Sequence, residues 1–219
     1  MKPKPLIIFD LDGTLYDFDN SNSVNFTSSR FYREIKNRAY AFLAAKLNID
    51  METAKDVYER IKQDFNGEVS LGVESQYGID RYEWFGATWN LDPKDFLKRE
   101  NRKSLLDSLE AEVAILTAAP RVWASRSLDY FGLSEYKNRL FTGEPDLRKP
   151  NPQAFKQICD AIGIPPKRTI SVGDQVATDI LPAKSIGMKT ILIRSYSNDA
   201  DYCTDSLEEL PNIIRRIQI

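Results

Sequence analysis

The chain has 219 residues, of which 42% are hydrophobic, and its 11 Phe, 10 Tyr and 3 Trp can build a substantial core. This length fits one large domain or a domain with a sizeable insertion. A formal net charge of -2 excludes the basic footprint of a nucleic-acid-binding protein. The sequence contains no His, which excludes His-dependent triads, His-ligated zinc and imidazole acid–base catalysis.

The two cysteines, Cys159 and Cys203, are too few for a disulfide framework, and neither has a metal-type partner nearby in the sequence. No signal peptide or membrane span is visible in the sequence. We therefore expect a cytoplasmic protein, a monomer or small homo-oligomer, with neither a membrane nor a nucleic-acid polymer as partner.

The first half of the chain starts with one short apolar run and continues with helical patterns. The run Leu6-Ile7-Ile8-Phe9 predicts a buried strand over 5–9, and no clear strand follows between 17 and 99. This stretch contains several helical signals: helical spacing over 23–48 and, from the N-cap Asp50, a helix through Phe65. The helical pattern breaks at Gly67 and Gly72. Further helices would start at the Asp80/Glu83 capping box and at Asp92-Pro93.

After about residue 100, short apolar strands alternate with helices. This order predicts an α/β fold: a Rossmann-like parallel sheet with helices on both faces, plus an inserted all-helical domain. The α/β core would comprise 1–16 and 100–219, and the insertion 17–99 would lie over the C-terminal edge of the sheet, where ligands bind in open α/β folds. The expected strands are 112–117, 140–143, 169–173 and 190–193, and the expected helices are 105–109, 121–131, 151–163, one ending at Gly187 and a last one capped by Ser206 and Glu209.

The pentapeptide Asp10-Leu11-Asp12-Gly13-Thr14 follows the first strand directly. In an extended chain Asp10 and Asp12 lie on the same side. Two like charges this close repel unless a cation compensates, so the pair suits a divalent metal with oxygen ligands or a nucleophile beside an acid–base. Gly13 permits a tight exit from the strand. Taken alone, the pentapeptide also fits a strand that ends in a polar turn.

Further polar residues follow the other predicted strands. Thr117 ends one strand, and its hydroxyl and the N–H groups behind it can hold an anion. Lys149 lies ahead of a helix start, with Arg148 as a rival cation. Because the ends of parallel strands meet at one edge, we expect one crevice in which four carboxylates require Mg²⁺ or a similar hard cation. The residues expected around it are Asp10, Asp12, Thr117, Lys149, Asp174 and Asp179.

With these motifs the chain resembles the haloacid dehalogenase-like (HAD) hydrolases. The pentapeptide at 10–14 is similar to the first motif of that family, Thr117 to the second, Lys149 to the third, and Gly173-Asp174 through Asp179 to the fourth. The motifs occur in the family's order and span nearly the whole chain, and the insertion 17–99 resembles the family's helical cap. Leu15-Tyr16, the stretch 77–80 and Glu83 loosely resemble the pyrimidine 5′-nucleotidase-like branch.

The resemblance implies a role for each matching residue. Asp10 would be the nucleophile that forms an aspartyl phosphate, and Asp12 would protonate the leaving oxygen and later activate water. Thr117 and the Ala118 N–H would bind the phosphoryl oxygens, while Lys149 would steady the nucleophile. The implied Mg²⁺ ligands are Asp10, the Asp12 backbone carbonyl and Asp174, with Asp179 direct or through water.

The resemblance also has departures and leaves alternatives. Ala118 stands where many nucleotidase-like relatives have Asn, and Gln175 replaces a small polar residue. The leading hypothesis is a Mg²⁺-dependent phosphatase of a small phosphorylated metabolite, for which a nucleoside monophosphate is one candidate. A phosphomutase or a catalytically idle phosphate-binding protein is the alternative. The candidate substrate contacts in the insertion are Arg30, Arg33, Tyr77, Arg81 and Trp84.

Overall fold

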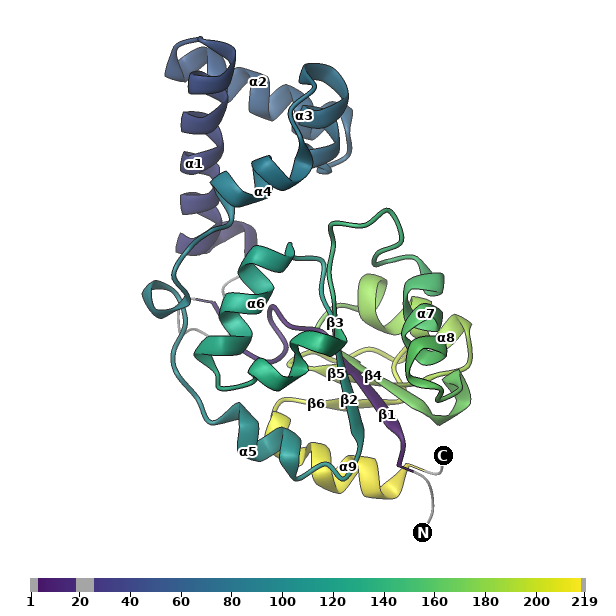
Figure 1. Ribbon diagram of the computed structural model, residues 1–219. Coiled ribbons are helices and arrows are strands. Elements are labelled where there is room, and N and C mark those ends of the chain that lie inside the picture. Colours follow the sequence, from purple (N-terminus) through teal and green to yellow (C-terminus); the bar gives the residue numbers. More distant parts are fainter. Residues whose placement is uncertain (1–3, 19–25, 218–219) are drawn as a thin grey trace.

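The sheet of the protein has six strands, and every strand pair is parallel. The computed structural model describes residues 4–18 and 26–217, and Figure 1 shows the sheet covered by helices on both faces. Along the sheet the strand order is β3-β2-β1-β4-β5-β6. The strands are β1 (Leu6–Phe9), β2 (Glu112–Leu116), β3 (Leu140–Phe141), β4 (Thr169–Gly173), β5 (Lys189–Ile193) and β6 (Tyr202–Thr204).

The strand β1 lies at the centre, between β2 and β4. Leu6 is in register with Glu112 on one side and with Thr169 on the other. The strand order changes direction between β1 and β4, which makes their carboxyl ends the topological switch point at which open α/β sheets bind ligands. A hydrogen bond from the Asp10 N–H to the Val172 carbonyl, at 2.9 Å, carries the pairing one residue past β1.

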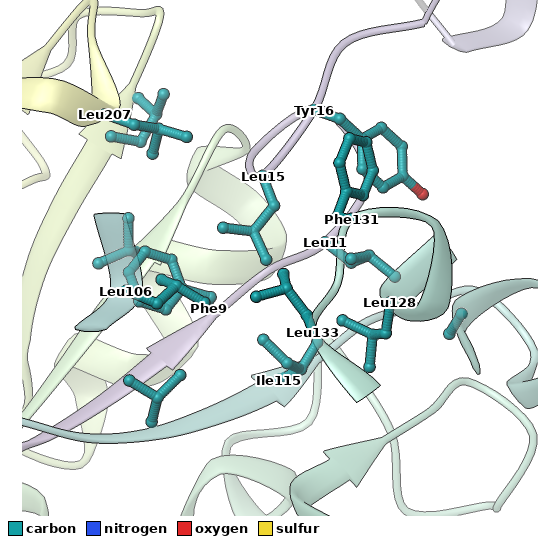
Figure 2. Close-up of a cluster of buried hydrophobic side chains, with 14 of the residues drawn as sticks. Phe9, Leu11, Leu15, Tyr16, Leu106, Ile115, Leu128, Phe131, Leu133 and Leu207 are labelled. Atoms are coloured by element: carbon teal, nitrogen blue, oxygen red, sulfur yellow. The ribbon is translucent and has the colours of Figure 1, made fainter. Parts of the chain in front are cut away.

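Alternating side chains of the strands fill two separate cores. Ile7 and Phe9 face the cluster that includes side chains of α5, α6 and α9, whereas Leu6 and Ile8 face the cluster with side chains of α7 and α8. Figure 2 shows part of the first cluster around Phe9, with the loop after β1 packed into it. The helices are α5 (Arg102–Asp107), α6 (Arg121–Tyr130), α7 (Pro152–Ile162), α8 (Leu181–Ser185) and α9 (Leu210–Arg216).

Four further helices form a group to one side of the sheet, at the top of Figure 1. Most of their buried apolar side chains belong to a third cluster, which is separate from the two cores of the sheet. Phe31 and Ile35, near the start of the first of these helices, instead pack into the core of the sheet. The helices are α1 (Arg30–Leu47), α2 (Met51–Asp64), α3 (Val69–Tyr77) and α4 (Arg81–Thr88).

Local sequence signals account for most of the helix ends. The carboxylates of Asp50 and Asp80 accept hydrogen bonds from the backbone N–H groups that begin α2 and α4, as expected of N-caps. Asn151 caps α7 in the same way, and Gly163 ends that helix with φ of 80°. Short helical turns complete the description: Phe26–Ser28, Pro93–Asp95, Ser134–Arg139, Pro166–Arg168, Leu207–Glu209 and the π-helical turn Val176–Ile180.

Three expectations about individual elements were wrong. The strand β6 was not expected, because three residues are too few to show a period. Gly72 does not break a helix but lies within α3, where a Cβ would come within 2.3 Å of the Ile61 side chain, so the glycine permits close packing on α2. The helix expected from 23 begins at Arg30, and its expected part over 23–25 lies outside the described residues.

The described segment 26–99 lies between β1 and β2 along the chain. Within 26–99 every regular element is helical. In the described part of the chain, no helix combines the length and the apolar character that crossing a membrane requires.

Candidate active site

The loops at the carboxyl ends of β1, β2 and β4 surround one cavity of about 840 Å³. Of the residues expected at a common crevice, Asp179 alone is absent from the cavity wall, and it lies directly behind Lys149. The structure therefore brings together the whole predicted set. Those lining the cavity are Asp10, Asp12, Thr117, Ala118, Lys149 and Asp174.

A buried lysine lies between two of the carboxylates. The Lys149 Nζ is 2.5 Å from Asp10 Oδ1 and 2.6 Å from Asp179 Oδ1, and its side chain is 3% exposed. Burial by itself disfavours the ammonium, but the charges of Asp10 and Asp179 outweigh that cost and hold the pKa of Lys149 above its ordinary value. Lys149 is thus a fixed positive charge beside the Asp10 carboxylate. Arg148, the rival cation, instead reaches Glu68 at 2.8 Å.

Two carboxyl groups of this cluster, those of Asp10 and Asp174, have pKa values above that of an ordinary aspartate. Burial raises the pKa of Asp10 well above its usual range; Lys149 opposes this shift, and the nearby charges of Asp179, Asp174 and Asp12 add to it. Burial and the charge of Asp179 raise the pKa of Asp174 to about 6. The single cation of Lys149 therefore does not compensate the acidic cluster fully.

The geometry of the acidic cluster fits a hard divalent cation. Carboxylate oxygens of Asp10, Asp174 and Asp179 all lie within 4.8 Å of one another, and such oxygens are the ligands that Mg²⁺ prefers. Gly13, with φ of 85°, lies so close to this cluster that a Cβ there would come within 2.6 Å of Asp174 Oδ2. The Thr14 hydroxyl, 3.0 Å from Asp10 Oδ2 and 3.4 Å from Asp174 Oδ1, connects the two carboxylates.

Asp179 accepts a hydrogen bond at each of its two carboxylate oxygens. Its Oδ1 accepts from Lys149, and its Oδ2 accepts from the Gln175 N–H at 3.0 Å. A Cβ on Gly173 would come within 2.4 Å of the Asp179 carboxylate, so the glycine at the end of β4 leaves room for it. Both oxygens of Asp179 thus already have partners in the protein.

Asp12 lies in a different environment from Asp10. Its Oδ1 accepts from the Tyr16 hydroxyl at 2.5 Å and from the Trp123 Nε1–H at 2.9 Å, and its Oδ2 accepts from the Thr117 hydroxyl at 2.9 Å. Burial raises the pKa of Asp12, and the three hydrogen bonds oppose that shift. Burial and the charge of Asp12 raise the pKa of Tyr16 well above its ordinary value, so Tyr16 is a neutral donor.

The turn after β2 is positioned by its close approach to the loop after β3. The Thr117 hydroxyl accepts from the Ala119 N–H at 3.0 Å, which fixes the turn after β2. A Cβ at Gly143 would lie 1.9 Å from the Ala118 carbonyl oxygen, so a side chain at that position would displace the turn. The sequence reasoning did not single out Gly143, because its neighbour is 25 residues away in the chain.

Two arginines hold the loop that follows Asp12. The Arg194 guanidinium, just after β5, donates to the carbonyls of Gly13 and Thr14 and lies 3.1 Å from the Asp17 carboxylate. The buried Arg102 donates to the Leu15 carbonyl at 2.7 Å. These contacts tie the segment leading towards α1 to the core of the sheet.

The cavity also has an aromatic wall that the sequence reasoning missed. Phe18, Phe26 and Trp89 line it, and the Phe26 and Trp89 rings are nearly parallel at 16° with centroids 6.2 Å apart. None of the five expected contacts from the insertion lines the cavity. Trp84 packs within the cluster of α1–α4, and Arg81 donates to the Glu144 carbonyl at 2.9 Å and pairs with Asp146 at 3.2 Å.

Comparison with known proteins identifies the family. A family model described as haloacid dehalogenase-like hydrolase matches residues 4–187. The chain belongs to the haloacid dehalogenase-like hydrolases. It is 26% identical to the glyceraldehyde 3-phosphate phosphatase of Methanocaldococcus jannaschii, with 97% of each chain covered, and 24% identical to the phosphoglycolate phosphatase of Psychrobacter arcticus, covering 86% of this chain and 82% of the relative.

Solved structures show the same haloacid dehalogenase-like fold. The structure of a HAD phosphatase from Thermococcus onnurineus matches with a TM-score of 0.66 at 22% identity, over 96% of this chain and 97% of that one. A 2-haloacid dehalogenase from Pseudomonas syringae matches with a TM-score of 0.64 at 20% identity, over 98% and 99%. The fold therefore accommodates both chemistries, and the choice between them depends on the residues of the site.

Proposed function

We propose that this protein is a Mg²⁺-dependent phosphatase that hydrolyses a small phosphomonoester through an aspartyl-phosphate intermediate. The observation that carries the proposal is a second carboxylate, Asp12, on the cavity that Asp10 and Lys149 line. A phosphoester needs a proton on its leaving oxygen, whereas a departing halide does not. The presence of Asp12 beside Asp10 therefore favours phosphatase over dehalogenase chemistry. The relatives named as phosphatases agree with this choice.

In the first step, an Asp10 carboxylate oxygen attacks phosphorus, and the bond from phosphorus to the ester oxygen breaks. The proton of the Asp12 carboxyl passes to that oxygen, so the alcohol leaves neutral and Asp12 becomes a carboxylate. The Ala118 N–H would hold a phosphoryl oxygen, and so would the Thr117 hydroxyl once its proton turns away from the protonated Asp12. The Lys149 ammonium keeps the Asp10 oxygen in place. Positioning and charge neutralisation of this kind supply most of the catalysis in phosphoryl transfer.

In the second step, water attacks the phosphorus of the aspartyl phosphate. Asp12, now ionised, takes a proton from that water as the bond to Asp10 breaks. Inorganic phosphate leaves, Asp10 is again a carboxylate and Asp12 is again protonated. One residue thus acts as acid and then as base, which is consistent with the pKa that burial raises and hydrogen bonds oppose.

The residues that would hold Mg²⁺ are Asp10, the Asp12 carbonyl and Asp174. When bound, the ion would neutralise charge on the phosphoryl oxygens and on the acidic cluster. Asp179 would contribute through water or by orienting Lys149, because it does not line the cavity and contacts Lys149 from behind.

The insertion 17–99, which carries α1–α4, would act as a cap that selects the substrate. Phe18, Phe26 and Trp89 would contact the leaving group, and a flat or apolar leaving group suits such a wall. The panel that tests this includes nucleoside monophosphates and aryl phosphates as flat substrates, and glyceraldehyde 3-phosphate and phosphoglycolate as small acyclic ones. Release of phosphate from each identifies the substrate class.

The test of the chemistry is turnover of p-nitrophenyl phosphate with and without Mg²⁺, in the native chain and in Asp10→Asn. We expect turnover that needs Mg²⁺ and a loss of at least about 10³-fold in the variant, because the nucleophile is removed. Near-native activity of Asp10→Asn would exclude the covalent role. Isomerisation of a sugar phosphate without net phosphate release would favour a phosphomutase. No turnover over a range of pH and metals would favour an idle phosphate-binding protein.

A further inference from the structure

The Asp12 carboxylate is held by donors from two directions. Tyr16 and Trp123 donate to Oδ1, at 2.5 and 2.9 Å, and Thr117 donates to Oδ2 at 2.9 Å. The Trp123 Nε1 is also 2.9 Å from the Tyr16 hydroxyl, so the two donors form one compact unit with Oδ1. Both oxygens of Asp12 thus have donors within the protein.

The two sets of donors differ in their relation to the cavity. Thr117 lines the cavity, but neither Tyr16 nor Trp123 does. Tyr16 is 2% exposed and Trp123 is 0% exposed. Oδ1 is therefore the oxygen held from the core, and Oδ2 is the oxygen on the cavity side.

We propose that Tyr16 and Trp123 are positioning residues that direct the proton-carrying oxygen of Asp12, Oδ2, at the leaving group. This inference rests on the proposed phosphatase function. An indole N–H can only donate, so Oδ1 stays an acceptor and the acidic proton is carried by Oδ2. That proton passes to the leaving oxygen as the phosphorus–oxygen bond breaks, and the attacking water returns a proton to Oδ2 in the second step.

Aromatic packing keeps both donors in place. The Tyr16 ring stacks on Phe131 with centroids 5.3 Å apart and an angle of 18°, and Figure 2 shows the two rings side by side. The Trp123 ring lies 4.1 Å from the ring of Phe31 in α1. The helix α1 therefore packs directly on the side chain that orients Asp12. Small displacements of an acid from its productive position are costly in rate.

The test compares kcat/KM for two substrates in Tyr16→Phe and Trp123→Phe. The value of kcat/KM depends only on the steps up to and including departure of the leaving group. Glycerol phosphate has a poor leaving group that requires protonation, and p-nitrophenyl phosphate has a good one that requires little. We expect each variant to lose about tenfold or more on glycerol phosphate and less than about threefold on p-nitrophenyl phosphate, as a fraction of the ~10²–10⁴-fold that acid–base catalysis supplies.

Matched controls separate this effect from general damage. Tyr58→Phe and Trp84→Phe make the same chemical changes at buried positions among α1–α4 that do not line the cavity. We expect both controls to keep the native ratio of the two kcat/KM values. Tyr16→Phe removes only a hydroxyl, so it tests the proposal even where Trp123→Phe does not fold, as checked by circular dichroism.

The outcomes separate the positioning role from the function on which it rests. A selective loss on glycerol phosphate in Tyr16→Phe, in the same direction as in Asp12→Ala, supports the positioning role. If Asp12→Ala is selective but Tyr16→Phe loses both substrates equally or neither, the positioning role is overturned and the phosphatase function stands. No turnover by the native chain with Mg²⁺ overturns the phosphatase function, and the positioning role with it.

Discussion

Replacing Lys149 by Met removes the cation that lies between Asp10 and Asp179 in the acidic cluster. Its Nζ contacts Asp10 and Asp179, whose side chains are 7% and 2% exposed. Methionine has a similar length, so the change deletes charge more than volume. Removing one partner of a buried ion pair costs about 3–5 kcal/mol, because the other charge is left buried without compensation. We expect a loss of that size in the free energy of unfolding at pH 7.5 without metal.

The loss should depend on pH in a direction that the site dictates. The pKa of Asp10 in the folded protein is already well above its ordinary value of 3.8, and removing Lys149 takes away the interaction that lowers it. A group with a raised folded pKa favours the native state when protonated, and this contribution is lost as pH rises through the folded pKa. The difference between the native chain and Lys149→Met should therefore be smaller at pH 5.0 than at pH 7.5.

The assay is urea unfolding followed by tryptophan fluorescence, at both pH values, with EDTA and with excess Mg²⁺. Lys156→Met is the matched control, because Lys156 pairs with Asp160 at the surface with its side chain 48% exposed; such a pair contributes about 0–1 kcal/mol. Mg²⁺ should recover part of the stability of Lys149→Met. A loss no larger than that of the control, or one independent of pH, would refute the reasoning.

Three further predictions concern the metal ligands and the contact between α4 and the loop after β3. Gly13→Ala should weaken Mg²⁺ binding at least about tenfold, measured by calorimetry, since a Cβ would displace Asp174. Gly78 is also at positive φ but in open space, so Gly78→Ala should leave Mg²⁺ binding unchanged and lower the free energy of unfolding by the backbone cost of about 1–3 kcal/mol. Equal Mg²⁺ affinity in the two variants would contradict this prediction. Because the pKa of Asp174 is about 6, protons compete with Mg²⁺ below that pH, and the affinity should fall about fivefold between pH 6 and 5; a constant Kd would count against Asp174 as a ligand. Arg81→Ala should raise KM a few-fold with little change in kcat, since the lost pair with Asp146 contributes about 0.2–1 kcal/mol. The control Lys46→Ala loses a pair with Glu83 between α1 and α4 and should leave KM unchanged. Matching KM values in the two variants would exclude a role for the Arg81 contact.

The sequence alone was enough for five of the six strands and for the residues that gather at the edge of the sheet. The run Leu6–Phe9 is buried at every position, so its apolar character shows directly in the sequence. Caps such as Asp50 and Asn151 act within three residues, and short-range hydrogen bonds of this kind are readable from local sequence. That Asp10 and Asp174 meet follows from a rule of topology, because the carboxyl ends of parallel strands share one edge.

Only the tertiary structure decided which other side chains hold the site residues in place. Trp123 donates to Asp12 across 111 residues, and Arg194 holds the Gly13 carbonyl across 181. A tryptophan in an apolar helix pattern is compatible with any core position, so its N–H acquires a partner only when α6 packs beside the loop after β1. The aromatic wall formed by Phe26 and Trp89 likewise depends on how the segments flanking α1–α4 return to the sheet, since no local period relates two residues so far apart.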